Sequence, residues 1–219
     1  MTISRQAASP ERNPGKRPPG RPRSENAHQA ILRSTIKLLR KTGFEQLSIE
    51  AIAADARVGK ATVYRWWPSK GALVVDAFAS STQDELHFPD SGSVYRDVSQ
   101  QLDQWLGVLR SPRGCIVRAI IAAGQSDPEL LVEFRKRLLR PRRQEAYETL
   151  RRGIVRGELP PDLDLDLVLD MLYGAIYMRF LIRHDELTEE YVRDVLSVVL
   201  KGAAAQNGKR KGHRRNGHG

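Results

Sequence analysis

Residues 48–67, SIEAIAADARVGKATVYRWW, contain two short helical patterns separated by a tight three-residue turn. Ser48 is a suitable N-cap for the first pattern, which places apolar side chains on one inward face. The second pattern begins at Lys60 and offers small, hydroxyl and basic side chains in place of an apolar face. A packing helix followed by a polar helix is typical of a helix-turn-helix, whose second helix enters the major groove of DNA. The stretch therefore predicts a DNA-binding module.

Helical periodicity continues through the rest of the chain, and no strict alternation of apolar and polar residues lasts longer than a few positions. Gly43 supplies a helix stop, and Pro141 is expected to kink or restart a helix. We therefore predict an all-α fold. Its expected parts are a disordered basic arm (1–24), a three-helix helix-turn-helix DNA-binding domain (25–80), a larger helical domain for effector binding and dimerisation (81–203), and a disordered basic tail (204–219).

The charge of the chain is concentrated at its two ends. The net charge is +10, and residues 1–24 hold six basic residues against one acidic residue. Residues 25–80 hold eight basic and five acidic residues. Residues 81–200 are slightly acidic, with sixteen basic and twenty acidic residues. Residues 201–219 hold six basic residues and no acidic one. A polyanion such as double-stranded DNA is therefore expected to meet the first third of the chain and the tail.

Several classes of protein are disfavoured by what the sequence lacks. The single cysteine, Cys115, excludes an internal disulfide and a four-cysteine zinc site, and its apolar neighbours CIVRAII predict a buried thiol. No catalytic triad or histidine pair has a credible spacing, and the phosphate-loop and calcium-loop patterns both fail, so we expect no enzyme activity, metal or cofactor. The chain has no long apolar stretch and no secretory signal, so we expect no membrane contact and a location in the bacterial cytoplasm with the nucleoid.

The order of residues across the two helices and the turn resembles the signature of the tetracycline-repressor (TetR) family over about residues 26–78. The matching positions are Ile52-Ala53, Val58, Thr62-Val63-Tyr64, Trp67, Ser69-Lys70 and Leu73. This resemblance implies DNA contacts by Ser48, Lys60, Thr62, Tyr64 and Lys70. We add Ala61 at the open end of the second helix and the outward-facing Arg65, while Val63 and Trp67 are expected to pack inward.

The turn departs from the family pattern. It usually reads Ala-Gly-Val-Ser, whereas this chain has Ala56-Arg57-Val58-Gly59. A positive φ at the second position suits glycine, so Arg57 is expected to strain the turn by roughly 1 kcal/mol. Its guanidinium group would lie near the DNA, and we expect it to reach a phosphate.

The larger domain of this family commonly encloses a ligand cavity. Six side chains are candidates for its lining, with ordinary core packing as the alternative: Trp105, Phe134, Tyr147, Tyr173, Tyr177 and Met178. The helices expected at 164–183 and 189–201 resemble the family's dimer helices, and the first of them carries the small residues Gly174 and Ala175 between Met171 and Met178. We expect them to form a four-helix interface with a second copy, with packing inside one chain as the alternative.

The arm contains GKRPPGRPR at 15–23, which resembles an AT-hook. Prolines keep such a segment extended, so Arg21 is expected to enter the minor groove. Pro19 stands where the hook has a second arginine, which reduces the inserted charge.

The sequence thus predicts a dimeric transcriptional repressor that binds a palindromic operator and is released by an unidentified small-molecule effector. The alternative is a constitutive DNA-coating protein with weak specificity and no effector, which would show a steep dependence of affinity on salt.

Overall fold

The computed structural model describes residues 25–215, with side chains described as far as Ala203. The predicted all-α class is confirmed, since the described residues form helices and turns and contain no strand. The basic arm, with Arg21, and the side chains of the tail lie outside the described part of the chain.

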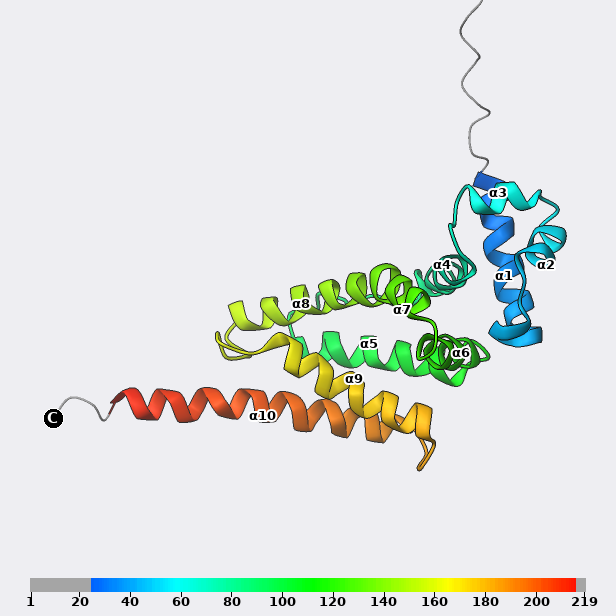
Figure 1. Ribbon diagram of the computed structural model, residues 1–219. Helices are drawn as coiled ribbons and strands as arrows, with labels where there is room; N and C mark the ends of the chain where they lie inside the picture. Colours follow the sequence, from blue (N-terminus) through cyan, green and yellow to red (C-terminus); the bar gives the residue numbers. More distant parts are fainter. Residues whose placement is uncertain (1–24, 216–219) are drawn as a thin grey trace, which may run out of the picture.

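The N-terminal helices form the smaller domain, at the right of Figure 1. Their bounds are α1 (Glu25–Gln46), α2 (Ile49–Asp55), α3 (Lys60–Tyr64) and α4 (Lys70–Thr82). Gly43 interrupts α1 with φ 77°, at the predicted stop. The hydroxyl groups of Ser48 and Ser69 accept hydrogen bonds from the backbone amides of Ala51 and Ala72, both at 3.1 Å. These caps satisfy donors that a helix start otherwise leaves unpaired.

The remaining helices form the larger domain. Their bounds are α5 (Val94–Arg110), α6 (Gly114–Gly124), α7 (Pro128–Phe134), the π-helical turn η1 (Arg135–Leu139), α8 (Arg140–Val155), α9 (Leu165–Ile182) and α10 (Glu189–Arg215). In Figure 1, α10 runs beside α9 and extends past the other helices. It continues well beyond Lys201, where the sequence pattern suggested an end.

Two local features of this domain follow from single residues. The predicted interruption near Pro141 takes the form of η1, because proline has no amide hydrogen for the helical ladder that precedes it. The prediction for Cys115 is wrong, since the residue is exposed and its thiol donates to the Pro112 carbonyl at 2.8 Å. The apolar run turns Ile116, Val117 and Ile120 inward and leaves Cys115 on the outer side of α6.

Helix α4 belongs to both domains. It packs on α1 at one side and on α7 and η1 at the other, and it stands between them in Figure 1. Its side chains Leu73, Val74 and Phe78 are fully buried. Gly71 allows the backbone of Leu130 on α7 to come close, because a Cβ at Gly71 would lie 3.3 Å from the Leu130 Cα. Helix α4 is therefore in direct packing contact with α7 and η1 as well as with α1.

Candidate nucleic-acid interface and ligand cavity

The recognition helix α3 is anchored by its inward side. Val63 is fully buried, and Trp67, which follows the helix, is 1% exposed. The indole N–H of Trp67 donates to Asp76 Oδ2 on α4 at 2.7 Å, and its ring stacks on His28 of α1 with centroids 4.7 Å apart. The end of α3 is thus fixed against both α1 and α4.

The other side of α3 is open to solvent. Its exposed residues include Lys60, Ala61, Tyr64 and Arg65, while Thr62 is half-buried. The Lys60 ammonium group forms an ion pair with Glu50 of α2 and lies 5.7 Å from the centre of the Tyr64 ring. The hydrogen bond between these charges lowers the pKa of Glu50 and raises that of Lys60, so both groups are ionised at neutral pH. A short basic and hydroxyl-bearing surface results.

Arg57 adopts the conformation that the turn pattern predicted. Its φ is 56°, in the left-handed region, and its side chain is exposed. The backbone amides of Arg57 and Val58 donate to the carbonyls of Ala54 and Ala53 at 3.1 and 2.9 Å. These bonds close the turn and hold an arginine where glycine would be unstrained.

Besides Lys60, which pairs with Glu50, two further predicted DNA contacts are engaged within the chain. The Ser48 hydroxyl caps α2. The Lys70 ammonium group donates to the Phe44 carbonyl at 3.0 Å and lies 4.3 Å from the centre of the Phe44 ring. Lys70 therefore ties the start of α4 to the end of α1.

An apolar cavity of about 80 Å³ lies inside the larger domain. It includes four of the six predicted lining residues, Trp105, Phe134, Tyr173 and Tyr177. Met178 lies outside it with 56% of its surface exposed. Tyr147 is also absent from the lining, and its hydroxyl donates to Asp166. The remaining lining residues, which the sequence pattern did not single out, are Leu86, Gln101, Leu138, Leu139, Arg142, Arg143, Ala146 and Leu169.

The polar groups of the cavity are mainly hydrogen-bond donors. The Tyr173 hydroxyl donates to Gln101 Oε1 at 2.5 Å, and the buried indole N–H of Trp105 has no partner within the described residues. Burial raises the pKa of both Tyr173 and Tyr177, so their phenol groups remain protonated. Such a lining suits an apolar molecule that carries an acceptor oxygen.

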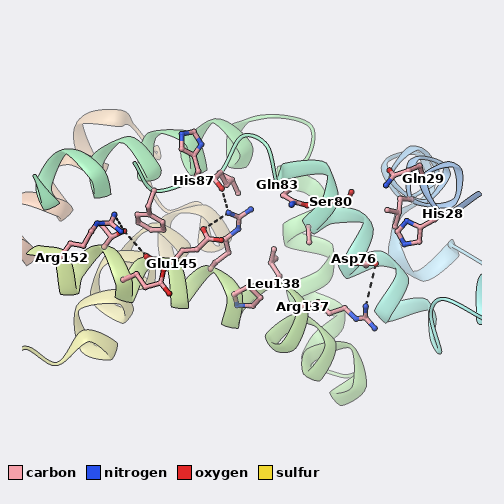
Figure 2. Close-up of a pocket in the computed structure, with 18 residues that line it drawn as sticks. His28, Gln29, Asp76, Ser80, Gln83, His87, Arg137, Leu138, Glu145 and Arg152 are labelled. Atoms are coloured by element: carbon pink, nitrogen blue, oxygen red, sulfur yellow. Dashed lines mark hydrogen bonds and ion pairs between the residues drawn. The ribbon is translucent and has the colours of Figure 1, made fainter. Parts of the chain in front are cut away.

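A larger groove of about 720 Å³ lies beside the cavity and runs between α1, α4 and α8. Figure 2 shows its polar walls, with His28 and Asp76 at one end and Arg152 at the other. The groove and the cavity share Leu86, Leu138 and Arg142. The Arg142 guanidinium group donates to the Leu86 carbonyl and thereby closes the wall between them.

An apolar stripe on α9 remains exposed in the single chain. Its residues lie four or seven positions apart, so they share one side of the helix, and each has about half or more of its surface exposed: Leu167, Met171, Met178 and Ile182. Val198 on the neighbouring α10 is 69% exposed. The stripe is not covered by packing within the described residues.

Comparison with known families accounts for this architecture. Residues 31–77 match the family described as bacterial regulatory proteins, tetR family, and residues 88–199 match the tetracyclin repressor-like C-terminal domain. The chain belongs to the TetR family of transcription regulators. It is therefore a DNA-binding regulator of the helix-turn-helix class, as the sequence predicted.

Individual TetR-family relatives cover most of the chain. It is 40% identical over 186 residues to the uncharacterized HTH-type transcriptional regulator YdeS of Bacillus subtilis, covering 85% of this chain and 94% of the relative. It is 26% identical over 188 residues to the DNA-binding transcriptional repressor TetR of Mycobacteroides abscessus, covering 83% and 98%. The crystal structure of the TetR-family transcription regulator SCO0332 matches with a TM-score of 0.73 and 36% identity, covering 81% and 98%.

Two structural findings bear on the expected partners. None of the helices in the described part of the chain is long and apolar enough to cross a membrane. The described residues also include no group of three or more histidine, cysteine or acidic side chains placed to hold a metal ion.

Proposed function

We propose that this TetR-family regulator is a dimeric repressor that binds a palindromic operator and is released when a small molecule enters the cavity of the larger domain. The observation that carries the proposal is the position of α4. This helix supports the end of the recognition helix through Asp76 and Trp67, and it packs on η1, whose residues Leu138 and Leu139 line the cavity.

The open side of α3 supports the DNA contacts. Lys60 and Thr62 are suited to base edges, and Tyr64, Arg65 and Arg57 to the phosphates and sugars around them. Ala61 leaves room for the groove wall, and Ser48, which caps the start of α2, is proposed to contact a phosphate. Lys70 contributes by holding α1 and α4 together, and any phosphate that it reaches must compete with the Phe44 carbonyl.

The exposed stripe on α9 and Val198 of α10 support a homodimer, because a second copy would remove these side chains from water. Two recognition helices related by a two-fold axis would meet successive major grooves about 34–36 Å apart. Sedimentation analysis checks this step. Met171→Glu together with Met178→Glu should give monomers, whereas Val155→Glu, a control at an exposed position on α8, should leave the dimer intact.

The size of the cavity supports release by an effector that reshapes the domain. Small-molecule sites usually have about 300–1,000 Å³, well above the volume present here. A ligand must therefore push the wall outward, and the wall includes Phe134 and Leu138 at the junction with α4. A coupling free energy of about 1–3 kcal/mol would lower operator affinity several-fold to about a hundredfold.

Selection of bound sequences from random DNA, followed by titration of the selected duplex, tests the proposal. We expect an inverted repeat and a strong preference over random DNA. Equal affinity for both, with a steep dependence on salt, would instead establish the DNA-coating alternative. A thermal-shift screen of small apolar compounds then identifies candidate effectors. Operator titration with and without each compound that binds tests release.

The basic arm is proposed to add affinity once the recognition helix has docked, with Arg21 in the minor groove. The site of action is the chromosome in the bacterial cytoplasm. Deletion of residues 1–23 should lower operator affinity and flatten its salt dependence. Unchanged affinity and salt slope would show that the arm is only a tether.

A further inference from the structure

One carboxylate oxygen lies between donors from the two domains. Asp76 Oδ2 accepts the indole N–H of Trp67 at 2.7 Å, and the Arg137 guanidinium nitrogen Nη1 lies 4.0 Å from the same oxygen. Figure 2 shows Arg137 directed at Asp76 across one end of the groove. Trp67 follows the recognition helix, whereas Arg137 belongs to η1 of the larger domain. The oxygen is therefore a point at which the two domains meet.

The Trp67 side of this contact is rigid. The indole is almost fully buried, and it is held between His28 of α1 and Asp76 of α4. An indole has a single hydrogen to donate, so loss of Asp76 would leave a buried donor unsatisfied. The bond thus positions the end of α3 relative to α4.

The Arg137 side of this contact is linked to the cavity. Its Nε is paired with Glu133, and the neighbouring Leu138 and Leu139 on the same turn line the cavity. A π turn holds an extra residue in the helix and is frequent at functional sites. A group that enlarges the cavity would press on the inner side of η1 while Arg137 stands on its outer side. The turn therefore connects cavity volume to the position of one guanidinium group.

We infer that Asp76 is a positioning residue that couples cavity occupancy to the recognition helix. Filling of the cavity displaces η1 and brings Arg137 Nη1 closer to Asp76 Oδ2. The charged guanidinium group then draws the carboxylate toward η1 and lengthens the Trp67 hydrogen bond, so the end of α3 loses its fixed position. This inference rests on the proposed function, because it assumes that the cavity takes the effector.

A second polar link joins α4 to the larger domain and supplies the control. Arg113, which precedes α6, donates to both carboxylate oxygens of Glu85 at 2.8 and 2.6 Å and to the Ser81 carbonyl at 2.8 Å. This link attaches to the C-terminal end of α4 and touches neither Trp67 nor η1. It is expected to stabilise the fold without transmitting cavity occupancy.

The test replaces the unidentified effector by a larger side chain inside the cavity. Ala146 is buried in the lining, so Ala146→Leu puts three further carbon atoms into the small cavity and presses on its wall. Operator affinity is measured by fluorescence anisotropy, on the duplex selected from random DNA, for the full chain with and without A146L. The backgrounds are wild type, Asp76→Asn, Arg137→Gln and Arg113→Gln. Asparagine keeps an acceptor oxygen for Trp67 and removes the charge that attracts Arg137.

We expect A146L to lower operator affinity about fivefold to a hundredfold in the wild-type and R113Q backgrounds. In the D76N and R137Q backgrounds the change should be less than about twofold, because the ion pair between Arg137 and Asp76 is lost. Without A146L, D76N should bind the operator more tightly than Asp76→Ala does, because asparagine keeps an acceptor oxygen for the Trp67 N–H and alanine removes it. Circular dichroism checks folding, and Ala146→Val replaces A146L under the same criteria if leucine prevents folding.

The other outcomes are distinct. An equal loss of affinity in the D76N background, or an effect removed only by R113Q, would overturn the role of Asp76 and leave effector release intact. No effect of the filled cavity in any background would overturn both this coupling and effector release, while operator recognition would stand.

Discussion

The carboxylate of Glu50 on α2 holds the ammonium group of Lys60, the first residue of the recognition helix. This ion pair crosses the helix-turn-helix at its most exposed point, with both side chains more than half exposed. A negative charge at this place repels phosphates, while it fixes the position of a lysine that is suited to base edges. Glu50 therefore favours selective binding over general attraction to DNA.

Glu50→Gln should raise the affinity for random DNA severalfold at low salt, because it removes a carboxylate that repels nearby phosphates. The affinity for the operator should rise less, so the ratio between the two should fall. Anisotropy titrations at several salt concentrations measure both. Asp55→Asn is the matched control, because it removes a carboxylate of the same helix that pairs with Lys37 at 2.6 Å. An equal increase for D55N would assign the effect to net charge.

Arg57→Gly should stabilise the DNA-binding domain by about 1 kcal/mol, because glycine adopts a positive φ without strain. Urea unfolding measures the change. DNA affinity should fall slightly and lose part of its salt dependence, since one cation is removed. Arg57→Ala separates the two effects: it should lose the same affinity and gain none of the stability. A gain of similar size in R57A would show that the turn is not strained.

Gly114→Ala should destabilise the larger domain by at least about 1–3 kcal/mol, the usual range for overpacking. A Cβ at this position would lie 2.0 Å from the Leu109 carbonyl oxygen, which is backbone and has little freedom to move. Gly107 on α5 offers the contrast, because a Cβ added there would have no atom of the described residues within 4 Å beyond its own helix backbone and chain neighbours. Gly107→Ala should therefore be neutral or stabilise by roughly 0.5–1 kcal/mol. Thermal unfolding of both variants tests this difference.

The loss of protein stability at acidic pH should depend on Asp166. Hydrogen bonds from Tyr147 and from Arg143 lower the pKa of Asp166 below its usual 3.8. A lowered folded-state pKa adds stability above pH 3.8, which is lost as the pH falls through the folded value. Asp166→Asn should thus reduce the urea midpoint at neutral pH. The difference in midpoint between the variant and wild type should disappear as the pH falls below 3.8. Asp103→Asn, at an exposed position of α5 with no ion-pair partner among the described residues, should change little at any pH.

Features set by neighbouring residues could be predicted from the sequence. The predicted cap at Ser48 depends on a hydrogen bond within three residues, and it is present in the structure. The positive φ of Arg57 also follows from the local turn. These features need no knowledge of how the helices pack, because sequence and geometry are linked over one turn of chain.

The side of a helix that each residue faces was harder to predict. Tyr177 lines the cavity, whereas the adjacent Met178 faces solvent, because successive helical residues point about 100° apart. Cys115 was placed inside by the same kind of error. The Arg142 contact with the Leu86 carbonyl spans 56 residues, and no local pattern indicates it. The wall between groove and cavity was therefore found only in three dimensions.

Helix α4 packs in both domains, and this has a consequence for the engineering of hybrid regulators. A hybrid regulator joins the DNA-binding domain of one relative to the larger domain of another. Here the boundary between these domains passes through a helix whose opposite sides are buried against different partners. A hybrid must combine the α1-facing residues of one parent with the α7-facing residues of the other within a single helix. Gly71 and Leu130 then have to be transferred as a pair, since any larger side chain at 71 would force the two halves apart.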